Sequence, residues 1–96
     1  DRVMTIRSIS DLVTRYYIRV TVADRAGVLA QMATVLGNLN ISIASVMQQE
    51  TDPRDQTAEL VITTHPSRER DVQQALQELE KLEVVREIGN LLRVEE

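Results

Sequence analysis

The spacing of apolar residues changes at a single glycine, Gly27, and this change constrains the fold more than any other feature of the sequence. From Tyr16 to Val22 every second residue suits a buried position, which is typical of a β-strand with one buried face. From Val28 to Leu39 the apolar residues recur at spacings of three and four, which is typical of an amphipathic helix. The sequence therefore predicts a strand, a turn over residues 24–27 and a helix over residues 27–38.

The rest of the chain repeats this alternation of strand and helix. Residues 41–50 and 57–64 are rich in β-branched side chains and flank a segment with turn chemistry, so they predict two strands joined by a hairpin. Residues 66–82 have a helical apolar face with acidic residues near the start. Residues 84–94 predict a last strand, which Gly89-Asn90 interrupts with a bulge or tight turn.

The predicted order is β-α-β-β-α-β, which is typical of a ferredoxin-like α+β sandwich. In this fold two helices cover one face of a four-stranded antiparallel sheet, and the other face is bare. Right-handed crossovers place the first and third strands in the centre and the second and fourth at the edges. A hydrophobic fraction of 43% in 96 residues suits one such core.

The second predicted strand lacks the usual protection of a sheet edge. Residues 41–49 contain neither a charged residue nor a proline, whereas natural edge strands are usually blunted by such residues. We therefore predict a homodimer in which this strand pairs with its symmetry mate through Ile43, Ser45 and Met47.

Composition argues against several classes of function. A net charge of -4 disfavours nucleic acids and anionic membranes as partners, and the absence of cysteine excludes thiolate zinc sites. No metal site is expected, because His65 is the only histidine. The three glycines are scattered rather than clustered into a phosphate-binding loop, so no dinucleotide cofactor is expected in this chain. With no targeting signal or membrane-length apolar run, we expect a cytoplasmic protein.

Two short segments resemble the signature of the ACT domain family, which comprises small regulatory modules that bind amino acids. These are residues 22–30 (VADRAGVLA) and 40–43 (NISI), and the resemblance extends over residues 16–95. More narrowly, residues 14–20 (TRYYIRV) and 58–65 (AELVITTH) resemble the C-terminal domain of bacterial homoserine dehydrogenases.

The narrower resemblance implies a longer parent protein. Residues 1–14 would be a connecting arm from an absent catalytic region, and residues 15–96 would be the ACT domain. That region would bind NAD(P) and interconvert aspartate semialdehyde and homoserine in threonine and methionine biosynthesis. The chain itself would be non-catalytic, and the domain would sense an end product, with threonine as the leading candidate. The alternative is a purely structural dimerisation module without a ligand.

The turn at Gly27 is the predicted effector site. The backbone amides of Gly27, Val28 and Leu29 would emerge from the positive end of a helix, where the carboxylate of an amino acid fits. Asp24 would receive the ammonium group of the same ligand. Each residue has a structural alternative, since Gly27 would also suit the turn alone and Asp24 would also suit a helix cap. Ala26 stands where the family commonly has proline, which makes a preformed loop less assured.

The resemblance also places Asn40, Ile41 and Ser42 across the binding groove, contributed by the second subunit. The alternative for Asn40 is helix termination, because asparagine tolerates the left-handed conformation that commonly ends helices. We consider termination the better explanation for the Asn40 side chain, while its backbone remains available to a ligand.

Overall fold

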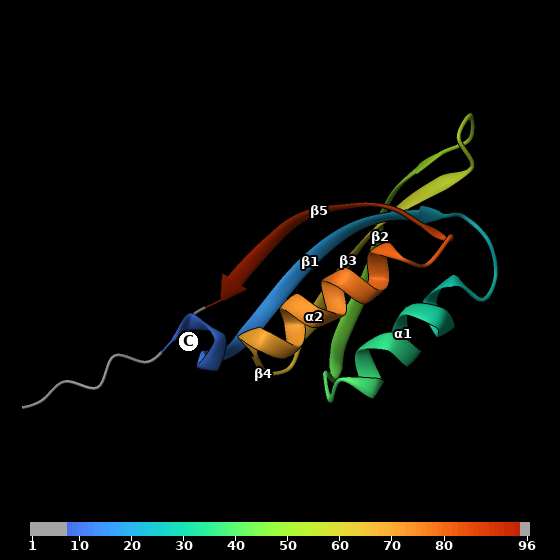
Figure 1. The fold of residues 1–96 in the computed structure, drawn as a ribbon. Helices are drawn as coiled ribbons and strands as arrows, with labels where there is room; N and C mark the ends of the chain where they lie inside the picture. Colours follow the sequence, from blue (N-terminus) through green and yellow to red (C-terminus); the bar gives the residue numbers. More distant parts are fainter. Residues whose placement is uncertain (1–7, 95–96) are drawn as a thin grey trace, which may run out of the picture.

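The computed structural model describes residues 8–94 and confirms the ferredoxin-like α+β class. The helices α1 and α2 lie on one face of a curled antiparallel sheet (Figure 1). In chain order the elements are η1 (Ile9–Asp11), β1 (Val13–Ala23), α1 (Val28–Asn38), β2 (Ile43–Asp52), β3 (Thr57–Thr64), β4 (Ser67–Arg68), α2 (Glu69–Glu80) and β5 (Val85–Val94).

The sheet has the predicted topology. β1 lies in the centre between β3 and β5, and β2 pairs with β3 on its other side. In the register, Ile18 faces Ile62 on β3 and Leu91 on β5. Within residues 8–94 no further strand pairs with β2, so β2 forms an edge of the sheet.

The core lies between the sheet and the two helices. The predicted buried face of β1 is confirmed, because Tyr16, Ile18, Val20 and Val22 are at most 2% exposed. These side chains pack with the buried stripes of the helices, which consist of Val28, Met32 and Leu36 on α1 and Val72, Ala75 and Leu79 on α2. Leu29 was expected in the stripe of α1 but is 44% exposed, because it lies on the flank of the helix.

Part of the predicted connecting arm, residues 8–14, is packed against the domain. β1 begins at Val13, three residues before the predicted start, and its first residues pair with β4. The Glu69 N–H donates a hydrogen bond of 2.7 Å to the Leu12 carbonyl, and Arg70 forms an ion pair with Asp11. Residues 8–14 are therefore attached to the start of α2. Residues 1–7 of the predicted arm lie outside the described residues.

Two further sequence predictions concern the start of α2 and the interruption of β5. α2 was expected from residue 66, but it begins at Glu69 because Ser67 and Arg68 form β4 instead. The predicted interruption at Gly89-Asn90 is confirmed by a register shift of β5 against β1 at this point. A side chain at Gly89 would place its Cβ 3.3 Å from the Arg19 carbonyl oxygen, so glycine permits the close approach of the two strands there.

None of the helices found in residues 8–94 combines the length and the apolar character needed to cross a membrane.

Candidate functional site

The turn from β1 into α1 exposes the amide groups of a helix start. Gly27 is the N-cap residue, with φ of +87° and ψ of -11°, a left-handed conformation that glycine adopts without a Cβ penalty. The first backbone bond of the helix runs from the Gln31 N–H to the Gly27 carbonyl at 3.1 Å. No side chain caps the helix. Within residues 8–94, the N–H groups of Val28 and Leu29 therefore have no protein acceptor.

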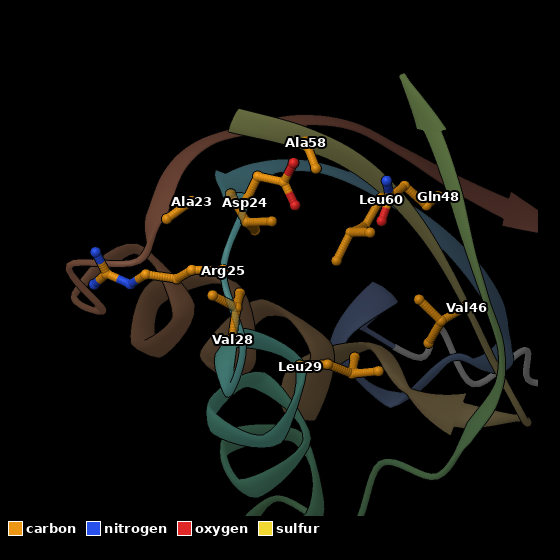
Figure 2. Close-up of a pocket in the computed structure, with 10 residues that line it drawn as sticks. Ala23, Asp24, Arg25, Val28, Leu29, Val46, Gln48, Ala58 and Leu60 are labelled. Carbon is orange, nitrogen blue, oxygen red and sulfur yellow. The ribbon is translucent and has the colours of Figure 1, made fainter. Parts of the chain in front are cut away.

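A pocket of about 280 Å³ opens beside this helix start, between α1 and the strands β2 and β3 (Figure 2). Its lining is largely apolar, because seven of the ten lining residues are Val22, Ala23, Val28, Leu29, Val46, Ala58 and Leu60. The other three lining residues are Asp24, Arg25 and Gln48. Such a lining, with few polar groups at its rim, is typical of a small-molecule site.

The two charged residues at the rim of the pocket, Asp24 and Arg25, differ in whether their side chains are available to a ligand. Arg25 turns away from the pocket in Figure 2 and forms an ion pair of 2.7 Å with Glu83. The Asp24 backbone N–H donates to the Gln56 carbonyl at 2.9 Å. Its carboxylate, in contrast, caps neither the helix nor the turn within the described part of the chain. Asp24 is therefore the rim group available to a cation.

The structure brings together only part of the predicted effector site. Asp24, Val28 and Leu29 line the pocket, and Gly27 lies next to them in the turn. Ala26 belongs to the same exposed turn but does not line the pocket.

The other three predicted residues lie at the opposite end of α1, about 16 Å along the helix axis. Asn40 has φ of +61°, and its N–H donates to the Gly37 carbonyl, so it terminates the helix as the alternative reading expected. Ile41 is buried in the core at 3% exposed, and the Ser42 carbonyl accepts a bond from the His65 N–H. Within one chain these residues do not share a site with Gly27.

The sequence analysis missed the wall of the pocket that β2 and β3 supply. Val46 and Gln48 of β2 face the same side as Leu60 of β3, next to the helix start. Strand alternation could have placed Val46 and Gln48 on the helix-bearing face of the sheet. It could not show that α1 leaves this part of β2 uncovered.

A second polar cluster is buried where α2 begins. The Glu69 carboxylate, 3% exposed, accepts bonds from the Tyr16 hydroxyl at 2.6 Å, from two Arg93 nitrogens at 2.8 and 2.7 Å, and from the Gln73 amide at 2.8 Å. The Arg93 bonds lower the pKa of Glu69 from 4.5 to about 2, although burial opposes them. Burial and the Glu69 carboxylate raise the pKa of Tyr16. Because every partner is satisfied, we interpret this cluster as an attachment of α2 to β1 and β5.

No group of side chains in the described residues is arranged to hold a metal ion. The glycines likewise provide no dinucleotide cradle, because Gly27 lies in the turn, Gly37 within α1 and Gly89 in the bulge of β5.

The fold defines a small α+β module with a pocket at its first strand–helix turn. The family model described as ACT domain matches residues 16–84, and the chain belongs to this family.

Curated relatives connect the chain with one enzyme. This chain is 42% identical over 86 residues to the homoserine dehydrogenase of a Synechocystis species, and the match covers 90% of this chain and 19% of that protein. It is 33% identical over 92 residues to the homoserine dehydrogenase of Corynebacterium glutamicum, covering 96% and 20%. The chain thus spans about a fifth of the length of these relatives.

Solved structures agree with the ACT fold and with the similarity to homoserine dehydrogenases. A homoserine dehydrogenase from Thiobacillus denitrificans matches with a TM-score of 0.77 and 28% identity, covering 94% of this chain and 19% of that one. The ACT domain from GTP pyrophosphokinase of Chlorobium tepidum has a TM-score of 0.59 at 13% identity over 86% of this chain and all of that one, which shows the shared fold.

Proposed function

We propose that this chain is the amino-acid-sensing regulatory and dimerisation domain of a homoserine dehydrogenase. Residues 1–14 would join the domain, residues 15–96, to a catalytic region that binds NAD(P). That region would interconvert aspartate semialdehyde and homoserine in threonine and methionine biosynthesis. This parent enzyme is supported by eight curated relatives that carry the name homoserine dehydrogenase and that each match over 83% or more of this chain.

The observation that carries the sensing role is the pairing of unused amides with an unused carboxylate at one pocket. The N–H groups at the start of α1 suit the carboxylate of an amino acid, because a helix N-terminus favours anions. The Asp24 carboxylate at the rim suits its ammonium group. The apolar lining leaves room for a short side chain, and threonine is the leading candidate.

The dimerisation role rests on the position of the pocket. Val46 and Gln48 belong to β2, the edge strand, so a second copy paired along β2 would close the open side of the pocket. Such pairing uses the unprotected edge around Ile43, Ser45 and Met47. It also offers a way for Asn40, Ile41 and Ser42 of one copy to approach the groove of the other.

Titration calorimetry of this chain with L-threonine tests the sensing role, and L-methionine and L-isoleucine are further candidate ligands. We expect saturable heat with at least one of them and loss of binding in Gly27→Asp, because the new carboxylate would repel that of the ligand. Gly37→Asp is the matched control at the far end of α1, where a side chain has open space. Absence of heat at millimolar concentrations of all three would leave the ligand-free dimerisation module as the function.

A further inference from the structure

Three large apolar side chains that the domain exposes lie close together in the sequence, just before β1 and at its start. Ile9 is 62% exposed, Leu12 is 41% exposed and Val13 is 55% exposed. A hollow of about 240 Å³ is lined by Ile9 and Leu12, together with Ser8 and Asp11. We call Ile9, Leu12, Val13 and this hollow the arm surface. Clustered apolar exposure of this kind is typical of an interaction site.

A larger cleft continues from the arm surface along α2. It has a volume of about 620 Å³ and is lined by Ile9 and Ser10 from the arm and by Gln73, Gln74 and Gln77 from α2. η1 packs beside α2 there (Figure 1). Within residues 8–94, the side-chain amides of Gln74 and Gln77 make no hydrogen bond. The cleft therefore adds free hydrogen-bonding groups to the apolar arm surface, as the polar rim does in a protein interface.

The ionised side chains that line the cleft are already paired within the domain. Each has a partner of opposite charge, in the pairs Glu69–Arg93, Arg70–Asp11 and Glu78–Lys81. Among the residues that the structure describes, the cleft therefore offers no unpaired charge to a small ion or a nucleic acid. A protein surface with little charge fits it better, because charged residues are depleted at the centre of protein interfaces.

The arm surface is a fixed part of the domain. The Leu12 carbonyl accepts a hydrogen bond from the Glu69 N–H at 2.7 Å, and the Thr14 hydroxyl donates to the Val94 carbonyl at 2.6 Å. Together with the ion pair of Asp11, these bonds hold residues 11–14 against α2 and β5. Leu12 cannot turn into the core without breaking them. A cover for the arm surface therefore comes from outside residues 8–94.

The polypeptide that precedes Ser8 is the nearest source of such a cover. This chain matches about a fifth of the length of the homoserine dehydrogenases, so under the proposed function the catalytic region belongs to the remaining four fifths. Residues 1–7 would separate that region from Ser8, and seven residues span at most about 25 Å. A tether of this length gives the two parts an effective concentration that is roughly millimolar. Even a weak contact surface is therefore occupied.

We propose that the arm surface and the cleft beside α2 form the docking surface for the catalytic region of the same polypeptide, a proposal that rests on the function proposed above. The docked region presents apolar side chains to Ile9 and Leu12, and it presents hydrogen-bonding groups to Gln74 and Gln77. Residues 8–14 then belong to a fixed junction between the two parts.

Hydroxyl-radical footprinting, read out by mass spectrometry, measures the exposure of individual side chains and tests this docking. The comparison is between the 96-residue chain, shown to be folded by circular dichroism, and the full-length polypeptide that contains it. We expect the oxidation rates of Ile9 and Leu12 to fall roughly threefold or more in the full-length polypeptide, because docking buries both side chains. Leu92 is the matched control, because it is 58% exposed on the sheet face away from the helices, and its rate should not change.

The variant Ile9→Asp tests the same contact within the full-length polypeptide. A carboxylate is costly to bury, so this variant should raise the oxidation rate of Leu12 to that of the isolated chain. It should leave the melting temperature of the isolated chain unchanged, since no residue of η1 is buried there. Leu92→Asp should leave Leu12 protected. A folded Ile9→Asp variant in which Leu12 stays protected contradicts the docking.

The activity of the full-length polypeptide separates this proposal from the function on which it rests. If the polypeptide reduces NAD(P)⁺ with homoserine but leaves Ile9 and Leu12 as reactive as in the isolated chain, the proposed function stands and the docking is wrong. A polypeptide without that activity contradicts the proposed function and, with it, the identity of the docked region. Protection of Ile9 and Leu12 that grows with the concentration of the isolated chain also overturns the proposal, because it assigns the arm surface to a second copy.

Discussion

At the scale of single residues, Gly27 adopts a backbone conformation that would destabilise the folded state if any residue with a side chain replaced it. Its φ of +87° lies in the left-handed region, and a Cβ there would meet no atom of the described chain within 4 Å. We expect Gly27→Ala to lower the free energy of unfolding by about 1–2 kcal/mol through backbone strain alone. Gly37→Ala within α1 should instead raise it by up to about 1 kcal/mol, because alanine favours a helix.

Urea denaturation of the two variants at neutral pH measures both changes. Opposite signs for the two glycines are the expected result. A stabilised Gly27→Ala variant would contradict the left-handed turn and with it the exposure of the amides at the start of α1.

Glu69 makes the stability of the domain sensitive to acid. Its pKa in the folded chain, about 2, lies below the unfolded value of 4.5, so the folded state favours the ionised carboxylate. The resulting stabilisation is fully present above pH 4.5 and is lost as the pH falls towards 2. The shift corresponds to about 3 kcal/mol.

We therefore expect Glu69→Gln to reduce the free energy of unfolding at pH 7 and to converge with the wild type near pH 2. Denaturation curves at several pH values measure the difference. Glu78→Gln is the control, because Glu78 is on the same helix but takes part only in an exposed ion pair with Lys81. A gap between wild type and Glu69→Gln that stays constant from pH 7 to pH 2 would be inconsistent with this pKa.

At the scale of the elements, β2 is the strand whose free edge would form the proposed dimer. Successive N–H groups of a strand point to opposite sides, so Ser45→Pro and Val46→Pro remove N–H groups on opposite edges of β2. We expect one variant to lose a bond to β3 and to be destabilised. The other should remain folded but lose pairing along β2 with a second copy.

Sedimentation and thermal denaturation of both variants distinguish these results. Proline on the outward edge should at least halve the mass of the assembly without a large change in the melting temperature. If the folded variant keeps the mass of the wild type, pairing through β2 is not the contact between copies.

Local sequence patterns predicted most helices and strands, because the spacing of apolar residues that distinguishes a helix from a strand repeats within a few residues. Alternation from Tyr16 to Val22 and the helical spacing after Gly27 each arise from one buried face, so both were confirmed. The pairing of β4 with the start of β1 joins residues more than fifty positions apart, and no local pattern indicates it. For this reason the sequence analysis began β1 at Tyr16 instead of Val13, and it began α2 too early.

The candidate site was likewise predictable only where local sequence patterns or the family resemblance define it. Glycine chemistry and the resemblance located the turn with Asp24, Gly27, Val28 and Leu29. The wall formed by Val46 and Gln48 depends on where α1 crosses the sheet, which is a tertiary property. In the proposed dimer, Asn40, Ile41 and Ser42 would approach the ligand of a second copy, and the sequence of one chain does not place that copy.

At the scale of the whole molecule, a site completed by two copies couples ligand binding to assembly. An effector that contacts both copies binds the dimer more tightly than the monomer, so by linkage it must strengthen the dimer. At a ligand concentration about 100 times its dissociation constant, the stabilisation reaches about 2.7 kcal/mol per site if the monomer does not bind. This coupling would give the domain a means of changing how two catalytic regions are held.

We expect the dissociation constant of the dimer to fall by at least tenfold in saturating L-threonine, or in whichever amino acid gives heat on titration. Sedimentation equilibrium with and without the ligand measures this change. D-threonine and the Gly27→Asp variant serve as controls, because neither should present a carboxylate and an ammonium group correctly to the amides of α1 and to Asp24. Saturable binding with an unchanged dissociation constant would place the whole site within one chain, and the pocket beside β2 would then sense its ligand without help from assembly.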